Sequence, residues 1–82
     1  MNMNLKNLQI EMVDGSFIEK DISKEIANLI YQNVNDIGML DIAMSLYKTG
    51  EVEMDDNQKQ IFRSIIDQNV KAFVKKAIFK LL

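Results

Sequence analysis

The sequence predicts an α+β domain in which an N-terminal β-hairpin is followed by three or four packed α-helices. Apolar and polar residues alternate from Leu8 to Ile22, which is typical of half-buried strands. After Ser23 the apolar residues recur every three or four positions, which is typical of helices. With 82 residues and no long linker, the chain is expected to form a single domain over residues 1–82.

The predicted hairpin covers about residues 5–22 and turns at Asp14-Gly15. A two-residue loop would place Ile10 opposite Glu19. A three-residue loop that ends with Gly15 in the left-handed region would place Ile10 opposite Ile18. We prefer the second register because it gathers the apolar side chains on one face. That face would hold Leu8, Ile10, Met12 and Ile18, whereas Phe17 would lie on the other face with Glu11 and Glu19.

The first two helices are expected over about residues 23–34 and 36–49. Ser23 is a candidate N-cap, with Ile22 packed against the first turn as a hydrophobic staple. Asp36 is the candidate cap of the second helix, which ends where Gly50 can adopt the left-handed conformation. Its apolar residues cover roughly 220° of the circumference, more than a small core usually hides. They are Ile37, Met39, Leu40, Ile42, Ala43, Met44, Leu46 and Tyr47.

Two further helices are expected over about residues 56–67 and 69–82, after an acidic connector at residues 51–56. Asp55 and Gln58 have the spacing of a capping box. Apolar residues at every fourth position from Phe62 to Leu82 drift about 200° out of phase over the length of one straight helix. We therefore expect a break or a strong bend near residues 67–69.

The composition excludes several classes of chemistry. The sequence has no Cys and no His, so it offers no disulfide framework, no thiol nucleophile and no imidazole ligand or base. Its three Gly residues are isolated, which excludes a glycine-rich phosphate loop. The acidic connector lacks the ligand spacing of a calcium loop. We expect a protein that is not an enzyme and that uses no metal, no other cofactor and no small-molecule substrate.

No segment has the pattern of a secretory signal, and no apolar run approaches the roughly 18 residues of a spanning helix. The expected compartment is therefore the cytoplasm. The small size and the Ile-, Lys- and Asn-rich composition give the impression of an accessory protein from a bacterium or a phage.

The C-terminal helix is the basic part of the chain. It carries four Lys and no acidic residue, whereas residues 1–69 carry six basic and twelve acidic residues. The candidate basic face consists of Lys71, Lys75, Lys76 and Lys80. A packing helix with a solvated lysine face is the simpler interpretation. Contact with nucleic acid or an anionic membrane is the alternative, which the net charge of −2 disfavours.

Phe79 is expected to project about 170° away from the centre of the apolar stripe of the last helix. The hairpin or the C-terminal residues could cover this ring, it could be an ordinary exposed apolar residue, or it could contact a second protein or a second copy of the chain. We expect Phe79 and the surplus apolar arc of the second helix to form one interface. The candidate interface residues are Met39, Ile42, Leu46 and Phe79.

These surfaces favour a small protein-interaction or assembly module. Its partner is expected to be another protein or a second copy of the chain in a homo-oligomer. A nucleic-acid- or membrane-associated accessory protein that uses the basic face is the alternative. The acidic connector could also meet the lysine face of another copy, a contact that high salt would weaken.

Overall fold

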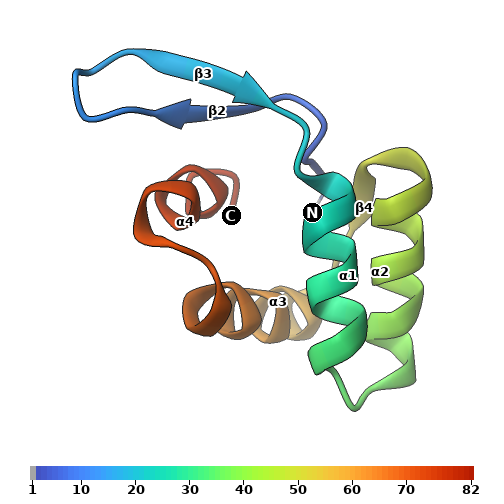
Figure 1. Ribbon diagram of the computed structural model, residues 1–82. Coiled ribbons are helices and arrows are strands. Elements are labelled where there is room, and N and C mark those ends of the chain that lie inside the picture. Colours follow the sequence, from blue (N-terminus) through green and yellow to red (C-terminus); the bar gives the residue numbers. More distant parts are fainter. Residues whose placement is uncertain (1) are drawn as a thin grey trace.

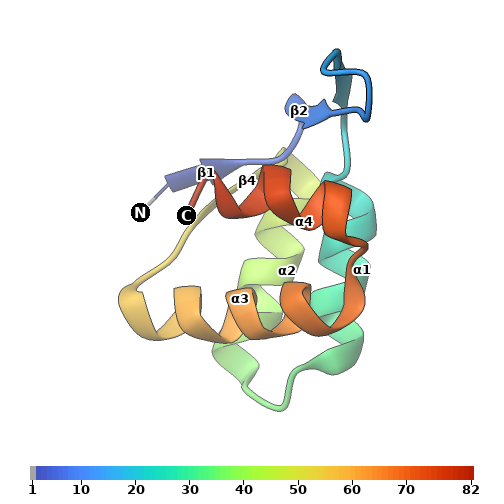
Figure 2. The same ribbon diagram turned by 90° about the vertical axis from the view of Figure 1, so that its left-hand side faces the viewer.

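The computed structural model describes residues 2–82 and confirms the α+β fold. Helices α1 and α2 lie side by side as an antiparallel pair, and α3 and α4 form a second layer across them (Figures 1 and 2). The β2–β3 hairpin lies over α4. The elements are β1 (Asn2–Asn4), β2 (Leu8–Glu11), β3 (Phe17–Lys20), α1 (Ser23–Asn33), α2 (Ile37–Thr49), β4 (Glu51–Glu53), α3 (Asp56–Asn69) and α4 (Ala72–Phe79).

The β2–β3 hairpin has the predicted register, with Ile10 opposite Ile18. Its turn is closed by hydrogen bonds from the Met12 amide to the Ser16 carbonyl (2.7 Å) and from the Gly15 amide to the Met12 carbonyl (2.9 Å). Gly15 has a φ of 86°, the left-handed conformation that glycine adopts without steric cost. The prediction of a three-residue turn is therefore confirmed.

The hairpin is covered unevenly. Leu8 and Ile10 are buried, whereas Ile18 on the neighbouring strand is exposed. Helix α4 packs against β2 and leaves β3 as an outer strand. The apolar face predicted for the hairpin is thus only partly covered, because α4 is a short helix that spans one strand of the pair.

A second pair of strands joins the N-terminal segment to the middle of the chain. Strand β1 runs antiparallel to β4, with Met3 opposite Val52 and both side chains buried. The amide of Leu5 extends this pairing by donating to the carbonyl of Gly50 (2.9 Å). The expectation that residues 51–56 are only a connector was wrong, because the single apolar side chain of β4 points into the core.

The capping predictions have mixed outcomes. Asp55 and Gln58 form the predicted capping box of α3, and the Asp36 carboxylate accepts from the Gly38 amide (3.1 Å) at the start of α2. Ser23 is not the N-cap of α1. It is the first helical residue, and both its amide and its hydroxyl donate to the carboxylate of Asp21 (3.0 and 2.6 Å). The carboxylate of Asp21, rather than the hydroxyl of Ser23, therefore accepts a hydrogen bond from an amide in the first turn of α1.

The break between the last two helices is confirmed. Helix α3 continues to Asn69, and α4 starts at Ala72 after an extended Val70. The change of direction allows Phe62 and Ile66 on α3 and Ile78 on α4 all to be fully buried in the same core. Helix α4 ends at Phe79 and is shorter than the predicted range of 69–82.

Among the described residues, no helix combines the length and the apolarity that crossing a bilayer requires.

Candidate functional site

Helix α2 is apolar on two sides. Its inner side is buried in the core through Met39, Ile42, Ala43 and Leu46. Its outer side nevertheless carries three large apolar residues that solvent reaches. Ile37 is 77% exposed, Tyr47 is 48% exposed and Met44 is 47% exposed. The broad apolar arc predicted from the sequence therefore exists, and about half of it lies outside the core.

Three of the predicted interface residues lie on the inner side. Met39, Ile42 and Leu46 are all at most 8% exposed, so in this structure they are core residues and offer no surface to a partner. The helical periodicity of the apolar residues predicts how wide the apolar arc of α2 is. It does not predict which part of that arc faces α1 and α3. The large apolar residues of α2 that are exposed to solvent are instead Ile37, Met44 and Tyr47.

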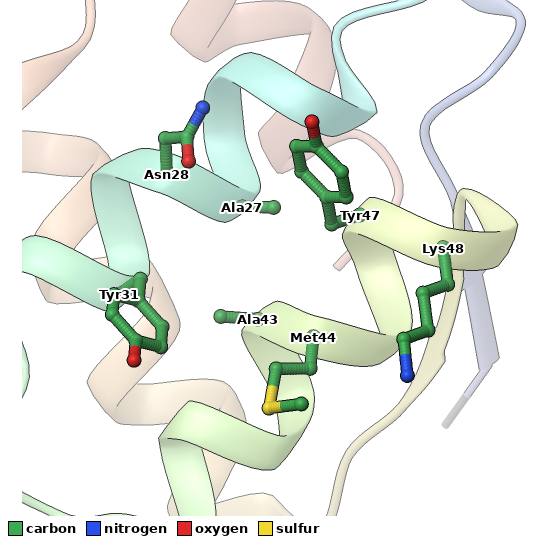
Figure 3. A pocket seen from close by; sticks show the side chains of 7 residues that line it. All are labelled: Ala27, Asn28, Tyr31, Ala43, Met44, Tyr47 and Lys48. Atoms are coloured by element: carbon green, nitrogen blue, oxygen red, sulfur yellow. The ribbon is translucent and has the colours of Figure 1, made fainter.

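An open groove of about 350 Å³ runs between α1 and α2 on this side of the molecule (Figure 3). Ala27 of α1 and Ala43 of α2 form its floor, and both are buried. Small residues at facing positions allow two helices to approach closely and leave a depression above them. The aromatic ring of Tyr31 on α1, which is 55% exposed, borders the groove together with Met44 and Tyr47. We call Tyr31, Ile37, Met44 and Tyr47 the outer face.

The charges around the outer face are arranged by sign. The ammonium of Lys24 lies 5.5 Å from the centroid of the Tyr47 ring, and Lys48 borders the groove near the same end of α2. Asp36 and Asp41 lie towards the other end, where α2 begins. Because α1 and α2 are antiparallel, the outer face has a positive end and a negative end.

Phe79 lies apart from the outer face. Its ring is half-buried on α4, and the guanidinium of Arg63 on α3 stacks over it at 4.5 Å from the ring centroid. The groove beside this ring is lined by α3 residues rather than by α2 residues. The structure therefore does not bring Phe79 together with the other predicted interface residues.

The four lysines of the candidate basic face turn towards different neighbours. Lys75 forms an ion pair with Asp67 (3.1 Å), and Lys76 forms one with Glu11 (2.8 Å). Lys80 lies 5.8 Å from the centroid of the Phe17 ring. Lys71 is exposed at the start of α4. Two of the four positive charges are thus compensated by carboxylates of the same chain.

The carboxylates with shifted pKa values have structural roles. The hydrogen bond from Lys76 lowers the pKa of Glu11, and hydrogen bonds from Ser16 and Ser23 lower the pKa values of Asp14 and Asp21 respectively. Asp14 and Asp21 are exposed groups in a turn and at the start of a helix, and the half-buried Glu11 belongs to a surface ion pair. Within residues 2–82, no three acidic, histidine or cysteine side chains come close enough together to hold a metal ion.

One signal in the sequence could have located the outer face. Ile37, Leu40, Met44 and Tyr47 follow one another at spacings of three, four and three, the pattern of a coiled-coil seam. The buried residues Met39, Ile42 and Leu46 form a second series with similar spacing on the same helix. The spacing alone therefore does not say which series faces the core and which faces solvent.

The chain matches no protein-family model, no curated protein sequence and no solved structure.

Proposed function

We propose that the protein is a small interaction or assembly module that acts in the cytoplasm without catalysis and binds another protein chain through the outer face. The observation that carries this proposal is the exposure of four large apolar side chains over two adjacent helices. In the absence of a partner, these side chains leave apolar area in water at a cost of about 25 cal/mol per Å².

The composition and the form of the outer face support the same role. Tyr and Met are enriched at the centres of protein interfaces, where rings and flexible thioethers fill pockets. Here they surround a groove whose floor is held rigidly by the packing of α1 on α2. Polar residues such as Asn28 and Lys48 border the groove, as a rim of polar groups borders most interfaces.

The basic helix supports a nucleic-acid or membrane role less well. Affinity for phosphates grows with the number of lysines that can neutralise them. Lys75 and Lys76 already face Asp67 and Glu11. A ligand with phosphates would have to displace those carboxylates.

Photo-crosslinking in the producing cells tests the proposal. The photoreactive residue p-benzoylphenylalanine replaces Tyr47 in one variant and Glu19, an exposed residue of β3, in the control. We expect ultraviolet light to produce an adduct with a protein chain from position 47 and none from position 19. Equal yields at the two positions, or no adduct at position 47, would contradict a binding role for the outer face.

A further inference from the structure

We propose that the partner of the outer face is a second copy of this chain, docked with α2 against α2 in antiparallel orientation. This inference rests on the proposed function and names its partner. It follows from the distribution of charge along α2, from the exposed apolar side chains of Met44 and Tyr47 on the same helix, and from the groove beside them.

The charges of α2 are self-complementary. Asp41 and Lys48 are seven residues apart, so they lie about two turns apart on one flank of the helix. An antiparallel copy related by a two-fold axis beside Met44 and Ser45 brings Asp41 of each chain opposite Lys48 of the other. Two equivalent ion pairs result, as expected for an isologous interface. The parallel arrangement would instead face Lys48 with Lys48.

The charges of Lys24 on α1 and of Asp36 at the start of α2 agree with this orientation. Lys24 lies at the same end of the outer face as Lys48, and Asp36 lies at the end of Asp41. The two-fold rotation therefore brings the positive end of one copy to the negative end of the other. The one acidic residue of α1, Glu25, borders a different groove, next to α4.

Two exposed apolar residues of α2, Met44 and Tyr47, lie near the same axis. Ile37 would lie opposite position 52 of the other copy, beyond the end of α2 at Thr49, so it is outside the contact between the two α2 helices. Met44 lies next to the axis, so the two copies of this side chain meet at the centre of the interface. Tyr47 of one copy then reaches the partner's Met44 and the edge of the groove floored by Ala27 and Ala43.

Charge reversal distinguishes this arrangement from docking on an unrelated protein. Asp41→Lys and Lys48→Glu each replace two attractive pairs in the dimer by two repulsive ones. We expect each variant to dimerise roughly tenfold more weakly than the wild type, given the strength of exposed ion pairs. The double variant Asp41→Lys/Lys48→Glu restores both pairs with reversed sign, and should dimerise like the wild type. It also keeps the wild-type net charge of −2.

Mixing the two single variants gives the sharpest result. Every ion pair in the mixed dimer is attractive, so an equimolar mixture should form a heterodimer at concentrations where each variant alone is monomeric. Sedimentation velocity over a hundredfold dilution measures these equilibria. Glu25→Lys is the matched control for Asp41→Lys, because it makes the same change of charge on the opposite flank of α1 and should leave dimerisation unchanged.

Met44→Glu provides an independent check, because it places two carboxylates at the centre of the dimer and should weaken association more than a hundredfold. Circular dichroism verifies that each variant is folded. A wild type that stays monomeric up to about 1 mM overturns the inference. So does a wild-type dimer that neither single charge reversal weakens. In either case, an adduct at position 47 with a different protein would leave the proposed function standing, whereas the absence of any adduct would remove both.

Discussion

Helices α2 and α4 both carry more apolar residues than one side of a small core can cover. The two helices differ in how far other parts of the chain cover these extra side chains. On α4, the ring of Phe79 is covered by Arg63 of α3 and the neighbouring lysines meet Glu11 and Asp67, so that Phe73 is the one large apolar side chain of this helix that stays exposed. On α2, Met44 and Tyr47 remain in solvent beside an open groove. The comparison teaches that a wide apolar arc indicates an interface only where the rest of the chain leaves it uncovered.

The largest expected effect separates the two sides of α2. Leu46→Ala removes a fully buried side chain and should lower the free energy of unfolding by about 2–5 kcal/mol. Met44→Ala, two residues away on the outer side, should change the stability of the monomer by less than about 0.5 kcal/mol. Urea denaturation at a concentration where the protein is monomeric measures both. Similar losses for the two variants would show that the outer face is part of the core.

The next effect concerns the residue that ends α2. Gly50 has a φ of 77°, and a Cβ at this position would meet the side chain of Lys6. Gly50→Ala should therefore destabilise the fold by roughly 1–2 kcal/mol, through backbone strain in the left-handed region. Gly15→Ala is the control, because its φ of 86° imposes the same strain while the space around it is open. Thermal unfolding should show a larger loss for Gly50→Ala than for Gly15→Ala, and equal losses would show that the contact with Lys6 adds no cost.

A smaller effect tests how α4 is covered. Arg63→Ala removes the cation that stacks on Phe79 and should cost about 0.5–1 kcal/mol of stability. Because this ring lies away from the outer face, the same variant should leave self-association unchanged. Gln60→Ala, one turn earlier on α3 and beside the same groove, is the control. A change in dimerisation with Arg63→Ala would instead indicate that the interface includes α4.

The smallest effect is on the pH dependence of stability. Hydrogen bonds lower the pKa values of Glu11, Asp14 and Asp21 in the folded state, so folding favours their ionised forms. Their contribution is complete above the unfolded pKa values of about 4 and is lost as the pH falls through the lower folded values. Thermal unfolding between pH 7 and pH 2 should show a decline confined to the acid end. For Glu11→Gln the decline should be shallower, and an identical curve would contradict the contribution of the Glu11–Lys76 pair.

Sequence reasoning succeeded mainly where the chemistry is local, with the start of α1 as the exception, because Ser23 donates to Asp21 instead of capping the helix. The hairpin register follows from one glycine in the left-handed region, and the ends of α2 and the start of α3 follow from Asp36, Gly50 and the Asp55–Gln58 capping box. Each of these signals lies within a few residues of the feature it specifies.

It failed where a long-range contact decides the outcome. Strands β1 and β4 have three residues each, too few for alternation to be recognised, and their pairing joins positions far apart in the chain. Met39, Ile42 and Leu46 were assigned to the surface because helical periodicity defines two apolar sides of α2 without saying which one α1 and α3 cover. The sequence thus predicted a broad apolar arc on α2 but not which part of that arc is exposed.

The pairing of β1 with β4 also has a consequence for the order of events during synthesis. Asn4 and Glu51 are hydrogen-bonded neighbours that lie 47 positions apart. At about 5–20 residues per second, a ribosome needs several seconds to make that length of chain. During that interval Met3 and Leu5, both buried in the finished fold, have no strand to cover them. Strand β1 is therefore made several seconds before the strand that it pairs with, and a nascent chain stalled before Val52 would expose it.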